Sequence, residues 1–261
     1  MGSGSLRPLI EHWIRGVIDL DTVAALECGG IIRMNIAGGR RVGDNGLMTE
    51  ESNVETERTL EELLADAWAG LSAAVTEGRH EWHVPVVSTM ASDGWPSARV
   101  VVLRGVWPEA PGGPVISCHT DLRSEKVREL GFESGGSRPM AWTFYERIRK
   151  VQLRVRGETT VHSNDDVANE AWSRTPTTSR RCYMAPHGPS GRLDSWHPNL
   201  PDAWRASVPD EASSEAGRVN FAVIRTRVSR LERLELHHDG HVRSAWRWEG
   251  ASLVDSTWLA P

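Results

Sequence analysis

Alternation of hydrophobic and polar residues predicts β-strands along most of the chain after residue 84. An apolar residue at every second position is typical of a strand that buries one face, and tight turns such as Asp239-Gly240 separate such runs. The predicted strands are Val84–Met90, Ser97–Arg104, Val115–Thr120, Met140–Tyr145, Val151–His162, Val219–Thr226, Arg233–His237, His241–Trp248 and Leu253–Trp258. Many short strands with few helices favour a mainly β (α+β) fold, arranged as a closed or half-closed antiparallel barrel.

Apolar residues at every third or fourth position predict a helix over Leu60–Glu77. Thr59 and Glu62 have the spacing of a capping box at its start, and Gly78 is a stop signal at its end. The apolar stripe consists of Leu60, Leu63, Leu64, Ala67, Trp68, Leu71 and Val75. We therefore expect this helix to cover one side of the sheet.

Three further segments depart from the strand pattern. Asn164–Arg174 follows Ser163, a residue type that caps helices, and predicts a helix. Residues 175–216 are rich in Pro, Ser, Gly and Trp and predict long loops with short helices. Residues 1–58 lack the periodicity of the rest. We interpret them as an N-terminal extension, partly disordered, that precedes a single folded domain at residues 59–261.

Composition narrows the class of protein. The 261 residues are 39% hydrophobic and 25% charged, which suits a globular domain, and the net charge of −5 gives no overall attraction to nucleic acid or anionic membranes. No run approaches the roughly 20 apolar residues of a membrane span. Three scattered cysteines do not make a disulfide framework, so we expect reduced thiols and a cytoplasmic location.

The stretch from His119 to Lys126 is the first candidate for chemistry. It follows a predicted strand and precedes a helix-like run at Val127–Leu130, so it places free backbone N–H groups and cationic side chains together. Side chains able to hold a phosphate there are Thr120, Arg123, Ser124 and Lys126. This arrangement alone is a weak signal, because any capped helix after a strand has a similar sequence.

Four segments in a fixed order make the signal specific. They are Arg99-Val-Val-Val-Leu-Arg104, His119-Thr-Asp-Leu-Arg-Ser-Glu-Lys126, Lys150-Val-Gln-Leu-Arg-Val-Arg-Gly157 and the closing Trp258-Leu-Ala-Pro261. In this order the chain resembles the pyridoxamine 5'-phosphate oxidase family over roughly residues 60–261. It is most similar to FMN-binding relatives that carry a T-D-x-R-S-x-K loop. The resemblance implies a Greek-key, antiparallel, FMN-binding split β-barrel with peripheral helices, working as a homodimer with FMN at the subunit interface.

The resemblance also implies roles for individual residues. Those expected to bind FMN are Arg99, Val100, Val101, Leu103, His119, Thr120, Arg123, Ser124, Lys126, Gln152 and Arg247, and those expected to bind substrate are Arg104, Arg174 and Arg243. These residue types suit FMN, whose phosphate needs cations and whose ring edge needs an amide such as that of Gln152. Strict alternation would place Arg99 and Arg104 on opposite faces of their strand unless a bulge intervenes.

The chain departs from the family pattern at several positions. Arg104 stands where the oxidase has a substrate-binding Lys, which keeps the charge but not the geometry. Glu125 stands where the family has a second basic residue in the phosphate loop, and Arg123 is a candidate replacement. His237 stands in the place of a flavin-contacting Trp, and Ala245 replaces the His of a substrate-binding Arg-x-His. The resemblance therefore implies that FMN binding is kept while recognition of vitamin B6 is weakened.

We thus expect an FMN-dependent oxidoreductase that passes electrons from an unknown small-molecule substrate to the flavin and on to oxygen or another acceptor. The alternatives are a non-catalytic flavin-binding protein, or a split barrel that holds another planar cofactor such as haem or a deazaflavin. The histidines of His80-Glu-Trp-His83 and His237-His-Asp-Gly-His241 lack the spacing of a metal site, so no metal is expected. The motifs of hydrolases, dinucleotide-binding proteins and P-loop ATPases do not occur.

Overall fold

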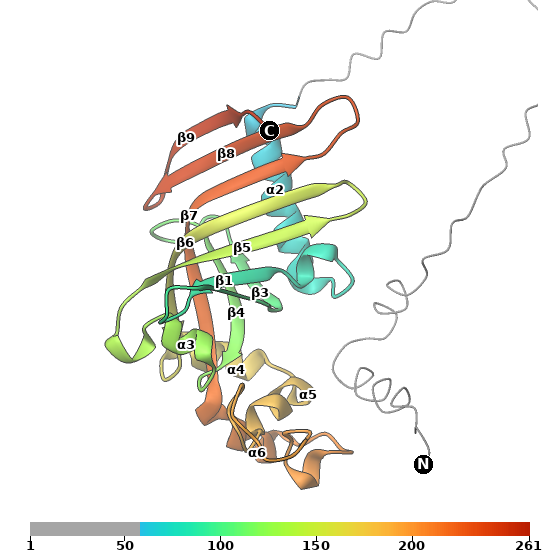
Figure 1. Ribbon diagram of the computed structural model, residues 1–261, viewed down its shortest axis with the longest axis vertical. Coiled ribbons are helices and arrows are strands. Elements are labelled where there is room, and N and C mark those ends of the chain that lie inside the picture. The colour runs from blue at the N-terminus through green and yellow to red at the C-terminus, as the bar shows by residue number, and fades with distance from the viewer. Residues whose placement is uncertain (1–57) are drawn as a thin grey trace, which may run out of the picture. The chain divides into compact units, whose positions relative to one another are not determined.

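The computed structural model describes residues 58–261, so the prediction for the N-terminal extension lies outside the described residues. Figure 1 shows a long sheet with helices behind it and at one end. The strands are β1 (Val86–Met90), β2 (Pro96–Val100), β3 (Leu103–Trp107), β4 (Val115–Asp121), β5 (Arg138–Glu146), β6 (Val151–His162), β7 (Phe221–Glu235), β8 (Val242–Glu249) and β9 (Ser252–Leu259). The α-helices are α2 (Leu60–Thr76), α3 (Glu125–Glu129), α4 (Asp166–Arg174), α5 (Thr177–Arg180) and α6 (Glu211–Ser214).

Short 3-10 helices fill the connections. They are η2 (Glu81–His83), η3 (Phe132–Ser134), η4 (Arg181–Met184), η5 (Asp202–Trp204) and η6 (Glu215–Asn220). Residues 175–220 thus form loops and short helices, as the composition predicted. In Figure 1 they gather with α4 beyond the end of β4 and the start of β7.

All nine strands belong to one antiparallel sheet, which confirms the mainly β fold. Its main path runs β2-β1-β5-β6-β7-β4-β3, and β8 and β9 extend it from the other half of β7. Strand β4 therefore lies beside β7 rather than β5, which is the non-sequential order of the expected Greek-key fold. The two ends of the path, β2 and β3, are separated in sequence by residues 101 and 102 alone. The sheet thus curls until its edges meet, but no ladder joins β2 to β3 among the described strands, and the barrel is not closed.

Strand β7 is the longest element of the sheet. One of its edges pairs with β6 along almost its whole length, and the other pairs first with β4 and then with β8. The prediction of two separate strands at Val219–Thr226 and Arg233–His237 was wrong. The charged run between them continues the strand because a register shift between Arg156 and Gly157 of β6 accommodates an extra residue on β7.

Two other boundaries differ from prediction. The expected strand Ser97–Arg104 is interrupted at residues 101 and 102. The N–H of Val101 donates to the carbonyl of Pro85 in register with the β1–β2 pairing, but Pro85 has no N–H to return the bond, and the ladder ends there. The N-cap of α4 is Asp165, whose carboxylate accepts from the N–H of Ala168 at 3.0 Å, so this helix begins later than a cap at Ser163 would imply.

Helix α2 has the predicted ends and face. Its capping box is complete, because the Thr59 N–H donates to Glu62 Oε2 at 2.7 Å and the Glu62 N–H donates to Thr59 Oγ1 at 3.2 Å. Helix α2 lies behind the sheet (Figure 1), and its Trp68 meets Trp248 of β8 edge to face at 6.0 Å. Most of the stripe is therefore buried in the main core.

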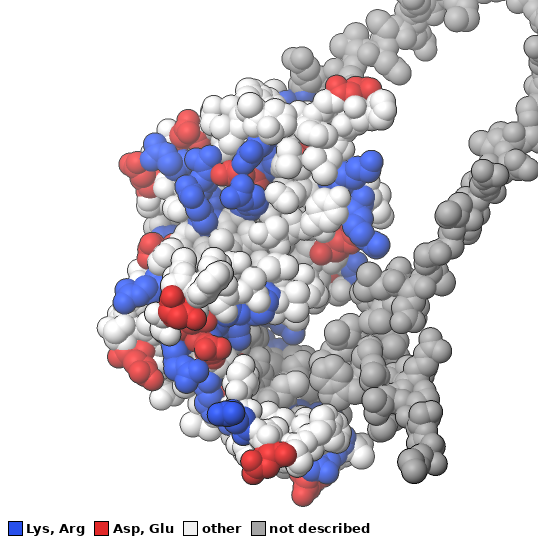
Figure 2. Space-filling view, viewed as in Figure 1, with Lys and Arg blue, Asp and Glu red and all other residues white. Residues whose placement is uncertain are grey.

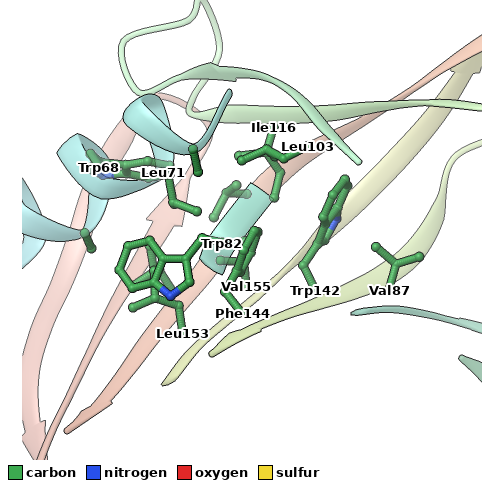
Figure 3. Packing of buried hydrophobic residues seen from close by; sticks show 14 of the residues in the cluster. Trp68, Leu71, Trp82, Val87, Leu103, Ile116, Trp142, Phe144, Leu153 and Val155 are labelled. Atoms are coloured by element: carbon green, nitrogen blue, oxygen red, sulfur yellow. The ribbon is translucent and has the colours of Figure 1, made fainter. Parts of the chain in front are cut away.

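The main core is unusually rich in tryptophan. Figure 3 shows Trp68, Trp82 and Trp142 among the buried aliphatic side chains of the sheet. The ring of Trp142 stacks on Phe144 at 6.2 Å, and its indole N–H donates to Thr226 Oγ1 at 2.9 Å. Burying a large ring stabilises the core as long as its polar N–H finds a partner, and the Thr226 hydroxyl satisfies that condition.

Gly157 offers a test of the register shift between β6 and β7. A Cβ at this position would lie 1.8 Å from the carbonyl oxygen of Arg227, a backbone atom that cannot move aside alone. We expect Gly157→Ala to lower the free energy of unfolding by about 3 kcal/mol or more, as other overpacking substitutions do. Urea unfolding of the two proteins measures this difference.

Gly78→Ala is the matched control, because a Cβ at Gly78 would meet no atom within 4 Å. We expect its unfolding free energy to stay within about 1 kcal/mol of the wild type. Equal stabilities for the two variants would show that β6 and β7 do not approach each other this closely at Gly157.

Candidate functional site

The end of β4 and the start of α3 form a cluster of hydroxyls around a lysine. Lys126 Nζ donates to Thr120 Oγ1 at 3.0 Å and to Ser124 Oγ at 3.3 Å, and these two hydroxyls lie 3.1 Å apart. Both hydroxyl side chains are buried. Burial lowers the pKa of Lys126, and the positive charge of Arg99 lowers it further. An anion bound here would offset both effects, so the cluster suits a phosphate.

A buried carboxylate stands beside this cluster. Glu129 Oε2 accepts from Arg99 at 2.9 Å and from the Thr89 hydroxyl, while its Oε1 is buried without a hydrogen-bond partner in the described part of the chain. Arg99 also donates to the carbonyl and hydroxyl of Ser97. Two cations and one carboxylate thus leave a single positive charge around Lys126. Sequence reasoning missed Glu129 and Thr89, because nothing local shows that α3 packs on β1.

Arg123 is held elsewhere. Its guanidinium donates to both carboxylate oxygens of Asp121, at 3.0 and 2.7 Å, and to the carbonyl of Ala185 at 3.0 Å. These contacts raise its pKa, mainly through the hydrogen bonds that it donates to Asp121. The structure therefore uses Arg123 to connect the β4 end to the 3-10 helix η4 and the loop after it. Its predicted role, as a phosphate ligand that replaces the basic residue which the family has at the position of Glu125, stays a prediction.

The backbone of β4 is open on one side at this point. Pairing with β3 ends where Cys118 meets Leu103, so residues 119–121 lie beside the break at residues 101 and 102 rather than beside a strand. His119 and Thr120 are neighbours on β4 and point to opposite faces. A ligand at this open edge can contact both faces of β4, the lysine cluster on one side and the His119 side on the other.

Arg104 is the extra residue of a β-bulge. The register of β3 on β4 shifts between Leu103 and Gly105, which leaves Arg104 without a partner residue on β4. A bulge re-aims the side chain that it carries, but this one does not bring Arg104 to the side of Arg99. Arg104 lines a cavity on the His119 side of β4, whereas Arg99 lies with Lys126 and Glu129.

The cavity next to His119 has a volume of about 300 Å³. It brings Arg104 of β3 together with Arg174 at the end of α4, two of the three residues predicted to bind substrate. Burial lowers the pKa of His119 to about 4, and the charge of Arg104 contributes, so the imidazole is neutral at pH 7. Its ring packs edge to face on Phe221 at 4.9 Å.

Several cavity residues were not predicted from the sequence. They are Trp107, Ser117, Glu170 and Arg225. One sequence signal could have indicated them, namely the spacing of Gly105 and Trp107, which puts both residues on one face of β3. Cys118, behind the cavity, is not a nucleophile, because burial raises the pKa of its thiol to about 12.

Gln152, Arg243 and Arg247 lie far from Lys126. Gln152 is ten residues from His162 on β6, and His162 and His119 both pair with Val223. At about 3.3 Å per residue, this separation is roughly 30 Å along the strand. Arg243 donates to Glu232 at 2.7 Å, and Arg247 pairs with Glu249. One protomer therefore does not bring these predicted residues to the lysine cluster.

The remaining predicted residues differ in what they offer. Leu103 is fully buried in the core and Val100 is 64% exposed, while Val101 is half-buried at the break between β2 and β3. His237 lies beyond β7 in a pair with Glu235, and Leu234 is the residue directly across from Gln152. The backbone around Val101, rather than these side chains, is what borders the open edge of β4.

Other site classes find no support in the described residues. Within 58–261, no group of three or more His, Cys, Asp or Glu side chains is placed to hold a metal ion. His80 Nδ1 accepts from the N–H of Trp82, and His83 Nδ1 lies 2.6 Å from the carbonyl of Ala74. None of the helices in this part of the chain is long and apolar enough to cross a membrane.

Comparison with known proteins finds a family model and a curated relative that match part of the chain. Residues 65–163 match the family model described as pyridoxamine 5'-phosphate oxidase, FMN-binding domain. The pyridoxine/pyridoxamine 5'-phosphate oxidase of Roseobacter denitrificans is 29% identical over 133 residues, which are 51% of this chain and 54% of that protein. The chain thus spans about half the length of the curated relative that it matches. These matches confirm the resemblance and support FMN, whereas the T-D-x-R-S-x-K subfamily stays a prediction.

Solved structures confirm the fold. A pyridoxamine 5'-phosphate oxidase-related, FMN-binding protein of Nostoc punctiforme aligns with a TM-score of 0.56 and 19% identity, over 75% of this chain and 96% of that one. PhzG of Burkholderia lata, in complex with tetrahydrophenazine-1-carboxylic acid, aligns with a TM-score of 0.52 and 17% identity, over 79% and 95% of the two chains. At these identities the likeness extends to the fold alone.

The neutral state of His119 predicts a pH dependence of stability. Its pKa is about 4 in the folded protein against 6.5 normally, so unfolding takes up a proton between these values. The contribution of His119 to the free energy of unfolding is therefore present above pH 6.5 and is lost as the pH falls toward 4. Between pH 7 and pH 5 the loss is about 2 kcal/mol. We expect His119→Gln to lose about 2 kcal/mol less than the wild type over that interval in urea unfolding.

His238→Gln is the matched control, because this side chain is 99% exposed and takes no part in the cavity. Its unfolding free energy should follow the pH dependence of the wild type. A His119→Gln protein with that same dependence would mean that the pKa of His119 is the same in the folded and the unfolded protein.

Proposed function

Because residues 65–163 match the FMN-binding domain model of the pyridoxamine 5'-phosphate oxidase family, we propose that this protein is an FMN-dependent oxidoreductase acting on a small anionic molecule. The observation that carries the proposal is the half-buried Lys126 ammonium, held by two buried hydroxyls beside the open edge of β4. Lys126, Thr120, Ser124 and Arg99 would hold the phosphate. When bound, FMN supplies a redox centre that accepts two electrons from the substrate.

The chain's own residues orient the substrate. Arg104 and Arg174 would attract an anionic group into the cavity on the other side of β4, close to the open edge. His119 is neutral and offers one donor and one acceptor nitrogen, so it can bind a polar substrate group without adding charge. The backbone of residues 101, 119 and 120 would border the flavin. These placements put the electron donor and the acceptor on the two sides of one strand end.

A homodimer completes this proposal. FMN is too short to reach from Lys126 to Gln152 within one protomer, so Gln152 and Arg247 can join the site only from a second copy. The exposed face that carries Gln152 continues over β5, β1 and β2 as an apolar surface that includes Tyr145, Val86, Met90 and Val100. An exposed apolar face of this kind favours association with another protein surface.

The same face is basic where β6, β7 and β8 adjoin. Figure 2 shows Lys and Arg side chains gathered there. Arg156, Arg230 and Arg247 lie directly across from one another on the three strands, and Glu232 in the neighbouring row accepts from Arg230 and Arg243. This row of arginines is the part of the face that would meet the flavin of the partner subunit.

We also propose a cytoplasmic location, supported by the free thiols of Cys118 and Cys182.

A flavin-binding protein without turnover would use the same site. Anaerobic mixing of the FMN-loaded protein with candidate donors distinguishes the two, because an oxidoreductase bleaches its flavin absorbance and a storage protein does not. The absorption spectrum of the purified protein also identifies haem or a deazaflavin, if either replaces FMN.

Lys126→Ala tests the phosphate site. Removing a charged hydrogen-bond donor should weaken FMN binding by about 1.5–3 kcal/mol, or roughly tenfold to 150-fold. Quenching of FMN fluorescence during titration measures the affinity. Arg128→Ala is the control, because Arg128 is an exposed cation on the same helix. Unchanged affinity in Lys126→Ala would remove this residue from the cofactor site.

Complementation tests the shared site. In a dimer of Lys126→Ala with Gln152→Ala, one site carries both changes and the other carries neither. Random pairing makes half of the dimers mixed, so about a quarter of all sites should regain wild-type affinity for FMN. The two variants are unfolded and refolded together, and tight FMN binding is counted by titration. If the refolded mixture contains no sites of wild-type affinity for FMN, each site lies within one protomer.

A further inference from the structure

Arg225 of β7 is a third arginine in the cavity, besides Arg104 and Arg174. It lies directly across from Ser117 on β4, and both side chains line the cavity. Its Nε is buried without a hydrogen-bond partner, and no carboxylate in the described part of the chain forms an ion pair with it. Asp165 feels its charge but bonds to Ala168 and His162 instead. Arg225 thus keeps unused donors inside a concave site.

The position of Arg225 is set by Trp107. The guanidinium carbon lies 5.0 Å from the centre of the Trp107 ring, a distance at which the ring face attracts a cation. The ring in turn lies over Gly105, where an added Cβ would come within 2.2 Å of it and within 2.8 Å of Ser117 Oγ. Only glycine at 105 leaves room for this indole on β3. Trp107, placed in the space that Gly105 leaves, therefore positions the Arg225 guanidinium in the absence of a ligand.

The cavity carries more positive than negative charge. Arg174 pairs with Glu170 at 2.7 Å, but both side chains are mostly exposed at the rim. Arg104, like Arg225, forms no ion pair with a carboxylate of residues 58–261, and the neutral His119 adds no charge. Three guanidinium groups against one carboxylate leave an excess of two positive charges. Arginine forks of this kind match planar oxyanions such as carboxylate and phosphate.

We infer that the cavity binds a small molecule with two separate anionic groups, one held by Arg104 and Arg174 and the other by Arg225. The volume of about 300 Å³ suits a molecule of that size. The inference rests on the proposed function in one respect, namely that this molecule is the substrate of the flavin. The pairing of two anionic groups with two arginine positions depends on the cavity alone.

Calorimetric titration of the full chain, saturated with FMN, tests this inference. The probes are phenyl phosphate, with one anionic group, and its 2-, 3- and 4-carboxy derivatives, with two. We expect the wild type to bind at least one carboxylated isomer about tenfold or more tightly than phenyl phosphate, because a second charge-assisted pair forms. In Arg225→Gln this preference should fall to about one, while affinity for phenyl phosphate changes by less than about threefold.

The control variant is Arg192→Gln, which makes the same charge change on an exposed loop outside the cavity and should keep the full preference. If Arg225→Gln does not fold, Trp107→Leu replaces it, since removing the ring face leaves Arg225 without its position and should lower the preference at least about threefold. Each variant is checked by circular dichroism.

Three results would overturn the inference. They are a wild type that binds none of the probes, a wild type without preference for any carboxylated isomer, and an Arg225→Gln protein that weakens all probes equally. Titrations repeated without FMN separate the two proposals. If the protein binds no FMN but still prefers a carboxylated isomer, the two-anion cavity stands and the flavin function is rejected. If it binds FMN but shows no such preference, the flavin function stands and the two-anion cavity is rejected.

Discussion

The pairing of β7 with different strands along its two edges is the constraint on which the rest of the structure depends. Its first half lies between β6 and β4, and its second half lies between β6 and β8. On its other edge β4 pairs with β3 only from Val115 to Cys118, so its end projects past β3 and leaves a free backbone edge. The lysine cluster and the cavity both form at this edge, so one long-range pairing creates both halves of the candidate site.

Charge is distributed so that the two sides of β4 differ. On one side, Glu129 neutralises part of the field of Arg99 and Lys126, and the hydroxyls of the cluster solvate the buried ammonium. On the other side, one carboxylate at the rim, that of Glu170, is the only one among residues 58–261 that pairs with a guanidinium group of the cavity. A protein can hold unpaired cations near one another only if they remain partly hydrated or await an anion. Such sites are therefore expected to favour anionic ligands.

Local rules explain why much of the fold could be predicted. Capping and periodicity act within a few residues, so the ends of α2 and the strands from β4 to β6 followed from the sequence alone. The errors occurred where a partner strand overrides local preference. Residues 227–232 look like a polar connection, yet β7 continues through them because β6 pairs with it throughout. The break after Val100 was missed because it depends on the residue across from Val101, which is Pro85 and has no N–H to continue the β1–β2 ladder.

The sequence by itself determined the mainly β class, the family resemblance and the residue types around Lys126, because motifs and alternation are properties of short segments. Only the tertiary structure decided which charged groups share a space. The bulge at Arg104, the pairing of Ser117 with Arg225 and the contact between Arg99 and Glu129 each join segments distant in the chain. Electrostatic function depends on distances through space, and those distances exist only after the strands have paired.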